Sequence, residues 1–257
     1  MVPRCITIAG SDSGGGAGIQ ADLKAFAAAG VHGMSAIVAL TAQNTREVTA
    51  VHEVPPWFVR AQLDAVAEDI GIDAAKTGML FSRSIIEAVA DWLGEHPLPL
   101  VVDPVMVATS GARLLEDDAV DVLVGRLFPL ATVVTPNVLE ARALTGADAP
   151  PAELAEALVA LGACAALVTG GHAAEPADHL FDGREHFEIP FEHRDIAATH
   201  GAGCTHSATL AALLARELSL VEAARGAAAA ASGAVVRGLV EIGAGDGPVD
   251  VLGVVAR

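Results

Sequence analysis

A thiol stands where a small-residue loop leads into a helical pattern in the stretch Thr199–Ala215, which reads THGAGCTHSATLAALLA. The first amides of a helix lack internal partners and carry partial positive charge, and small side chains let them approach an anion closely. The amides of Gly201–Gly203 could therefore hold a phosphate, with Cys204 beside it. The same amides would shift the thiol of Cys204 toward thiolate. Cysteine is also a common small core residue, and the residue types alone leave both interpretations open.

A second glycine-rich segment, GSDSGGGAG at Gly10–Gly18, lies between a strand pattern and a helical pattern. The dinucleotide fingerprint G-x-G-x-x-G is not in register in either glycine stretch. The phosphate loop G-x-x-x-x-G-K-[ST] is excluded as well, because no lysine directly follows these glycines. The segment is either a second contact for a ligand or only a tight turn between strand and helix.

The elements that must position these residues follow from an alternation of short β-branched runs with longer helical stretches. We expect strands at 6–10, 35–41, 73–79, 100–106, 131–137 and 165–171, then a hairpin at 178–183 and 185–190. We expect helices at 18–29, 56–70, 82–94, 116–127, 152–161, 204–217 and 220–240. This order predicts a mostly parallel sheet covered by helices on both faces, with ligands at the carboxyl ends of the strands. Polar residues gather at those ends: Asp12, Gln43, Lys76, Asp103, Asn137 and Thr169.

Composition limits the classes of function. The chain has 257 residues, of which 53% are hydrophobic and 18% charged. This composition favours a single α/β domain that comprises residues 1–257. The net charge of −17 argues against nucleic acid or an anionic membrane as partner, so an anionic ligand must be held by local amides. No secretory signal and no uninterrupted apolar run of membrane-spanning length is found. Three cysteines without metal-ligand spacing favour a reducing cytoplasm.

Six motifs occur in an order that resembles the hydroxymethylpyrimidine/phosphomethylpyrimidine kinase family of thiamine biosynthesis. They are AGSDSGGGAGIQADLKAF, TAQNT, KTGM, VVDPVM, TPNVLEA and THGAGCT, and together they extend over nearly the whole chain. The loop HGAGCT resembles the anion hole of ribokinase-like kinases, in the branch that carries cysteine where sugar kinases carry aspartate. The resemblance implies a three-layer α/β/α fold with a mostly parallel central sheet and a small edge hairpin. It also implies ATP and Mg²⁺ as cofactors, hydroxymethylpyrimidine and its phosphate as substrates, and a homodimer.

The resemblance also implies roles for individual residues. Catalysis would involve Gly201, Ala202, Gly203 and Cys204, and Mg²⁺ would lie near Asp103 and Glu140. The nucleotide would contact Asn137, Thr169 and Thr205. The acceptor would contact Gln43, Asp22, Gly10, Ala17, Met79 and Val105. Several of these have ordinary alternatives: Gln43 could be a solvated loop residue, Asp22 an exposed helix carboxylate, the four wall residues core, and Asn137 only a helix N-cap. The role of Lys76, one of two lysines, is left open.

A partly formed thiolate at Cys204 could act as general base for the hydroxyl of the acceptor. The phosphate oxygen that reacts in the second step needs little deprotonation. This interpretation predicts that Cys204→Ala slows the first phosphorylation more than the second.

Two features of the sequence keep a second activity open. Many members of the family carry lysine where this chain has Thr169, and the threonine form resembles the cysteine-type pyridoxal kinases. Gln43 in TAQNT and the lack of a second cysteine in VMVATSG favour the pyrimidine as acceptor. A ligand-binding relative without turnover is a further alternative, and the intact glycine loop and carboxylates argue against it.

Overall fold

A nine-stranded sheet forms the centre of the protein in the computed structural model, which describes residues 1–106, 118–170, 176–192, 196 and 198–254. The order of the strands across the sheet is β3-β2-β1-β4-β5-β6-β7-β8-β9. Neighbouring strands from β2 to β7 in this order are parallel, whereas β3, β8 and β9 run antiparallel to their neighbours. The strands are β1 (Arg4–Asp12), β2 (His32–Gln43), β3 (Val48–Glu53), β4 (Ala74–Thr77), β5 (Leu100–Val102), β6 (Val133–Val134), β7 (Ala166–Val168), β8 (Ala177–Phe181) and β9 (His186–Pro190).

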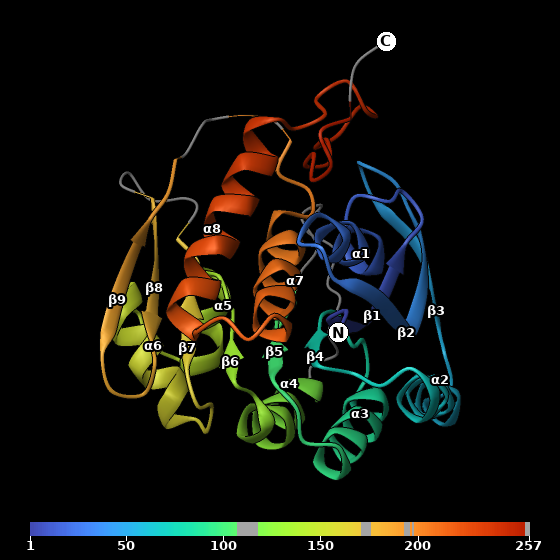
Figure 1. The fold of residues 1–257 in the computed structure, drawn as a ribbon. Helices are drawn as coiled ribbons and strands as arrows, with labels where there is room; N and C mark the ends of the chain where they lie inside the picture. The colour runs from blue at the N-terminus through green and yellow to red at the C-terminus, as the bar shows by residue number, and fades with distance from the viewer. Residues whose placement is uncertain (107–117, 171–175, 193–195, 197, 255–257) are drawn as a thin grey trace.

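Helices cover both faces of this sheet, as Figure 1 shows. One apolar cluster joins the sheet to α1, α7 and α8, and the other joins it to the helices from α2 to α6. The helices are α1 (Gly18–Ala28), α2 (Pro56–Asp69), α3 (Arg83–Glu95), α4 (Ala119–Val122), α5 (Val138–Thr145), α6 (Pro151–Ala160), α7 (Ala202–Ala215) and α8 (Leu220–Val236). The expected three-layer α/β/α architecture with an edge hairpin is therefore confirmed.

Alternating side chains of the central strands explain the three layers. In β5, Val101 packs into the cluster with α1, α7 and α8, whereas Leu100 and Val102 pack into the opposite cluster. Successive residues of a strand point to opposite faces, so a strand that is apolar at every position must be covered twice. The continuous apolar runs in the sequence are therefore the cause of the sandwich.

Helix α7 is buried around most of its circumference because its side chains are small. Nine of its fourteen residues are buried, and it packs between the sheet, α1 and α8 (Figure 1). Small side chains let helices and strands approach closely, so α7 can bring its first turn directly over the strand ends. No helix among the described residues is long and apolar enough to cross a membrane.

Several elements differ from the expected ones. Strand β3 (Val48–Glu53) was not among the expected strands, because its half-exposed surface weakens the apolar signal. The helix expected at 116–127 is α4 followed by a π-helical turn at Leu123–Leu127, and residues 116–117 lie outside the described part. Helix α8 ends at Val236 rather than at Val240.

Candidate active site

The loop at the start of α7 presents backbone amides to open space. Gly201 has a left-handed backbone (φ 84°), and a Cβ there would collide with the carbonyl oxygen of Gly16, so the position requires glycine. The amide of Ala202 donates to the carbonyl of Thr199 at 3.0 Å. The amides of Gly203 and of the following residue find no acceptor among the described residues. A Cβ on Gly203 would meet no atom within 4 Å. The turn therefore offers free donors beside space that a ligand can occupy.

The thiol of Cys204 is in a different state from the one expected. The residue is partly exposed, but burial of its sulfur raises the pKa of Cys204 to about 12, and the negative charges of Asp22 and Asp103 add to the shift. The cation of Lys76 and the amide of Gly18 oppose it without overcoming it. The expectation that the helix terminus shifts Cys204 toward thiolate is therefore wrong for the ligand-free protein, because desolvation and neighbouring carboxylates outweigh the amides.

A buried ion pair lies beneath this turn. The Nζ of Lys76, in β4, is 3.0 Å from both carboxylate oxygens of Asp22 and 4.0 Å from Oδ2 of Asp103. Thr7 donates its hydroxyl to Asp22 at 2.6 Å. Lys76 and Asp22 are fully buried, so the alternative of an exposed helix carboxylate at Asp22 is wrong.

The charges of this cluster depend on one another. Burial alone would lower the pKa of Lys76, but the negative charges around it, that of Asp22 first, raise the pKa above its usual value. Burial raises the pKa of Asp22, although Lys76 and Thr7 oppose the shift. Each buried charge is therefore tolerated only because the other is present.

The first glycine-rich segment is a tight turn wrapped around Asp12. The carboxylate of Asp12 accepts hydrogen bonds from the amides of Gly14, Gly16 and Ala17 at 2.7–3.0 Å, and from Nε2 of His200 at 3.0 Å. Burial alone would raise the pKa of Asp12, but the bond from His200 and the backbone amides hold it below its usual range. These amides are already used by the protein, so the loop before α7 is the better anion site. Asp12 and His200 also join the two glycine loops to each other.

Most expected acceptor contacts lie around the ends of β1 and β4. The amide of Gly10 donates to the carbonyl of Met79 at 3.1 Å, and a Cβ on Gly10 would collide with the methyl group of Met79. Ala17 is the residue before α1, and Val105 follows β5, with its amide bonded to the carbonyl of Asp103 at 2.9 Å. The four residues come from different parts of the chain but belong to the same edge of the sheet.

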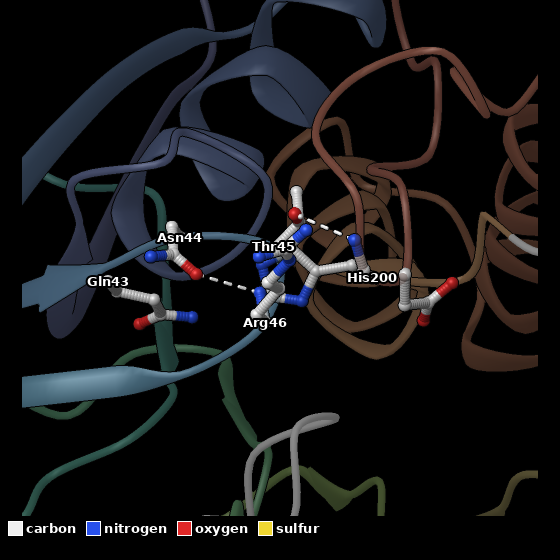
Figure 2. Close-up of a pocket in the computed structure, with 7 residues that line it drawn as sticks. Gln43, Asn44, Thr45, Arg46 and His200 are labelled. Atoms are coloured by element: carbon white, nitrogen blue, oxygen red, sulfur yellow. Dashed lines mark hydrogen bonds between the residues drawn. The ribbon is translucent and has the colours of Figure 1, made fainter.

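Gln43 lines a cavity of about 320 Å³ at this edge, shown in Figure 2. Its Oε1 accepts a bond of 3.1 Å from the hydroxyl of Thr41. The cavity is enclosed by the tip of the β2–β3 hairpin, by His200 and by a C-terminal loop; its lining residues are Gln43, Asn44, Thr45, Arg46, His200, Gly245 and Asp246. Cys204 is not among them, but His200 directly precedes the loop Gly201–Cys204, which we call the anion loop. Gln43 thus faces a cavity next to that loop.

The expected metal and nucleotide residues follow the next three strands of the sheet. Asp103, after β5, accepts a bond of 2.8 Å from the hydroxyl of Ser207 on α7. Glu140 accepts bonds from the amides of Asn137 at 3.0 Å and Met106 at 3.3 Å. Burial raises the pKa of Glu140 to about 7, and the negative charge of Asp103 adds to the shift. The two carboxylates are therefore close enough for the charge of Asp103 to raise the proton affinity of Glu140.

The N-cap role of Asn137 is confirmed. Its side chain accepts the amide of Glu140 at 2.9 Å, and the pair forms a capping box at the start of α5. Thr169 forms a bridge with Asn137 at the end of β7. Thr205 is fully buried, and its hydroxyl has no hydrogen-bond partner among the described residues.

Sequence reasoning missed two side chains on the second turn of α7. Ser207 bonds to Asp103, and His206 bonds to Asp178 on β8 at 2.9 Å. Their positions just after the anion loop could have identified them in the sequence. Polar side chains there can bond to the polar residues at the strand ends. Among the described residues no cluster of three or more His, Cys, Asp or Glu side chains could hold a metal alone.

Known proteins share this fold and sequence. The model of the family described as phosphomethylpyrimidine kinase matches residues 12–250. The hydroxymethylpyrimidine/phosphomethylpyrimidine kinase of Rhizobium meliloti (strain 1021) is 50% identical over 257 residues, which cover 97% of this chain and 97% of that protein.

Two solved structures extend the comparison. The phosphomethylpyrimidine kinase of Clostridium difficile 630 superposes with a TM-score of 0.79 at 38% identity, over 89% of this chain and 96% of that chain. The pyridoxal kinase of Bacillus subtilis, solved as an ADP complex, has a TM-score of 0.87 at 37% identity, over 97% of both chains. The match over almost the whole chain, together with the ribokinase-like sandwich and the open amides before α7, places this protein in the phosphomethylpyrimidine kinase family.

Proposed function

We propose that the protein is an ATP-dependent kinase that phosphorylates 4-amino-5-hydroxymethyl-2-methylpyrimidine and then its monophosphate, in thiamine biosynthesis. One observation carries the proposal: within the described part of the chain, the amides of Gly203 and Cys204 have no protein acceptor at the N-terminus of a long buried helix. Phosphoryl transfer needs positioned donors for the charge on the transferring group more than it needs covalent chemistry. We further propose that residues 1–257 act as a single kinase domain.

The acceptor binds at the ends of β1 and β4 in this proposal. The amide side chain of Gln43 both donates to and accepts from the edge of the aminopyrimidine ring. The wall of the site comprises Gly10, Ala17, Met79 and Val105. The expected contact of Asp22 with the acceptor is replaced by a supporting role, because Asp22 is fully buried against Lys76 and Thr7. The hydroxymethyl oxygen then lies toward the open amides of the anion loop.

Asp103 and Glu140 fit a magnesium ion. Both are carboxylates with hard oxygen donors, and the negative charge of Asp103 helps to raise the pKa of Glu140, which supports a cation between them. Mg²⁺ keeps several waters and takes few protein ligands, so two carboxylates together with the phosphates of ATP suffice. When bound, the ion would neutralise charge on those phosphates. Thr169, Thr205 and Asn137 are the proposed nucleotide contacts.

Cys204 acts as a neutral thiol in this proposal. With a pKa of about 12, the thiol keeps its proton at neutral pH and does not serve as a general base. Its sulfur lies beside the free amides and the Asp22–Lys76 pair, so it fills and shapes the space next to the acceptor oxygen. This replaces the expectation that the first phosphorylation depends on a thiolate.

Release of ADP tests the proposal when hydroxymethylpyrimidine, its monophosphate and pyridoxal are offered separately at equal concentration. We expect acceptor-dependent turnover with both pyrimidines and slower turnover with pyridoxal. Gly203→Ala should lower turnover about 100-fold with all three acceptors, because its methyl group enters the anion space. Turnover that strongly prefers pyridoxal would overturn the choice of acceptor, and ADP release that ignores added acceptor would overturn the kinase assignment.

Pyridoxal phosphorylation is the second candidate. The likeness to the Bacillus subtilis pyridoxal kinase and the presence of Thr169 favour it. The glutamine at position 43 favours the pyrimidine instead. The lack of a second cysteine in the segment VMVATSG was the other argument for the pyrimidine. Residues 107–111 of that segment lie outside the described part.

We also propose that the protein is a cytoplasmic homodimer that binds small molecules and not nucleic acid or membranes. The free thiols of Cys5, Cys164 and Cys204 agree with a reducing compartment. The net charge of −17 disfavours polyanionic partners. Sedimentation of the purified chain tests the assembly, and a monomer at micromolar concentration would contradict it.

A further inference from the structure

A second buried ionisable pair lies beside the anion loop and has no part in the mechanism proposed above. His206, on the second turn of α7, donates from Nε2 to Oδ2 of Asp178 on β8 at 2.9 Å. The exposed fractions of the two residues are 5% and 2%. The two positions are 28 residues apart in the sequence. A buried pair that spans two elements fixes the distance and rotation of one against the other.

The other oxygen of the same carboxylate holds the end of β7. Oδ1 of Asp178 accepts the amide of Gly170 at 3.1 Å. Val168 pairs with His179 across β7 and β8, so Thr169 and Asp178 are the next positions along the two strands. A Cβ on Gly170 would collide with the carbonyl of Ala177, so the backbone here is closely packed. His206 is thereby linked through Asp178 to the strand end that carries Thr169.

The pair is poorly explained as a device for stability. The second ring nitrogen of His206, Nδ1, is buried and has no hydrogen-bond partner among the described residues. An unpaired buried polar atom weakens a fold, and apolar residues of similar size often replace a buried pair without loss of stability. A leucine at this buried position would avoid that cost. The directional bond, rather than burial, is what histidine adds.

The N-terminal part of α7 is held to the sheet on another side as well. Ser207, the next residue, donates to Asp103 at 2.8 Å after β5. The two bonds reach different strands, β5 and β8, from adjacent residues. Together they resist rotation and sliding of the turn that presents the free amides of Gly203 and Cys204. Misplacement of such donors weakens their hold on a phosphate.

We propose that His206 is a positioning residue for the phosphates of the nucleotide: its bond to Asp178 fixes the anion loop against the ends of β7 and β8. This inference rests on the proposed function, since it concerns how the same loop binds ATP. It assigns His206 no contact with the acceptor. Loss of the bond therefore weakens the nucleotide and leaves the acceptor largely unaffected.

Calorimetric titration with Mg²⁺ and AMP-PNP, alongside KM measurements for ATP and for the acceptor, tests the inference. We expect His206→Leu to weaken AMP-PNP binding and raise KM for ATP about tenfold, with KM for the acceptor changed less than about twofold. The midpoint of urea unfolding should stay the same or rise. Thr209→Val, a buried position one turn further along α7, is the matched control and should leave both nucleotide values unchanged.

A conservative variant distinguishes the bond from the volume of the side chain. His206→Gln keeps a donor that can reach Asp178, so it should recover most of the nucleotide affinity that leucine loses. The inference is overturned if His206→Leu binds AMP-PNP as the wild type does, if glutamine and leucine are equally impaired while folded, or if both KM values rise together. None of these results concerns the turnover of the wild type on the pyrimidines. The proposed function is therefore tested separately, by acceptor-dependent release of ADP.

Discussion

Lys76 holds two buried carboxylates in place beneath the anion loop. Its ammonium lies 3.0 Å from Asp22 and 4.0 Å from Asp103, so it spans the expected acceptor side and the expected metal side of the site. Lys76 lies on β4, Asp22 on α1 and Asp103 just after the neighbouring strand β5, so the cation joins three elements. The rarity of lysine in this chain was only a weak signal for a role of Lys76. The structure shows that Lys76 is a fully buried cation.

Removal of this cation should destabilise the protein. Lys76→Met leaves Asp22 buried without a counter-charge, which typically costs about 3–5 kcal/mol. Urea unfolding measures the loss. Lys24→Met is the control, because the only other lysine donates to the carbonyl of Gly15 and is partly buried rather than fully buried. Adding Asp22→Asn to Lys76→Met should restore part of the stability, and equal losses for the two lysine variants would contradict the prediction.

The pKa of about 12 for Cys204 leads to a second prediction at this scale. Because the folded protein holds the thiol proton more tightly than an exposed cysteine does, no ionisation of Cys204 should appear in kcat between about pH 6 and pH 9. Cys204→Ser should therefore keep the shape of the pH profile for both phosphorylations. Alkylation of the native thiol by iodoacetamide should be slow across the same range. A step in kcat that the serine variant loses would restore the general-base role.

The junction before α7 is the element on which the site depends. Its first residue, Gly201, needs a left-handed backbone, whereas Gly203 lies inside the helix and faces open space. The helix can reach the strand ends because its buried side chains are small. Neighbouring bonds from His200, His206 and Ser207 tie this turn to β1, β8 and β5.

The two glycines should respond differently to the same substitution. Gly201→Ala places a methyl group against the carbonyl of Gly16 in a strained backbone, so we expect a loss of about 2 kcal/mol or more in the free energy of unfolding. Gly203→Ala should leave stability within about 1 kcal/mol, because alanine favours a helix. Turnover of Gly203→Ala should nevertheless fall about 100-fold, because the methyl group occupies the anion space. A stable, fully active Gly203→Ala would contradict the assignment of that space.

At the scale of the whole molecule, segments far apart in the sequence meet around the cavity that Gln43 lines. The hydroxyl of Thr45, at the hairpin tip, accepts the amides of Ala244 and Gly245 at 3.3 and 3.1 Å. The carboxylate of Asp246 accepts the amide and the hydroxyl of Thr199 at 3.0 and 2.8 Å. Figure 2 shows the hairpin tip and His200 around the same cavity. The C-terminal loop therefore joins the hairpin of Gln43 to the approach to α7.

Loosening this junction should affect the acceptor first. Thr45→Val keeps the shape of the side chain but removes the acceptor of two loop amides, so the hairpin that carries Gln43 becomes less well placed. We expect KM for hydroxymethylpyrimidine to rise about fivefold, with a smaller change in KM for ATP. Thr49→Val, on the same hairpin, loses a bond of 3.0 Å to the carbonyl of Ala42 and serves as control. An equal rise in both variants would show a general effect on the hairpin.

The sequence by itself determined the layers and the anion loop. Apolar runs such as Leu100–Val102 are buried on both faces, and the alternation of strands and helices leads to a parallel sheet. The order of small residues before α7 predicted free amides at a helix terminus. Both are local properties of short stretches of chain. The edge strand β3 was missed because its half-exposed residues lack such a local pattern.

Tertiary structure decided which groups are charged and which amides are free. Asp12 uses the amides of the first glycine loop, Asp22 is buried against Lys76, and the thiol of Cys204 keeps its proton. None of this follows from spacing, because desolvation and the sum of nearby charges depend on residues from distant strands. The bond of His206 to Asp178 is of the same kind. Chemistry at this edge of the sheet is set by neighbours in space, whereas the sequence records neighbours along the chain.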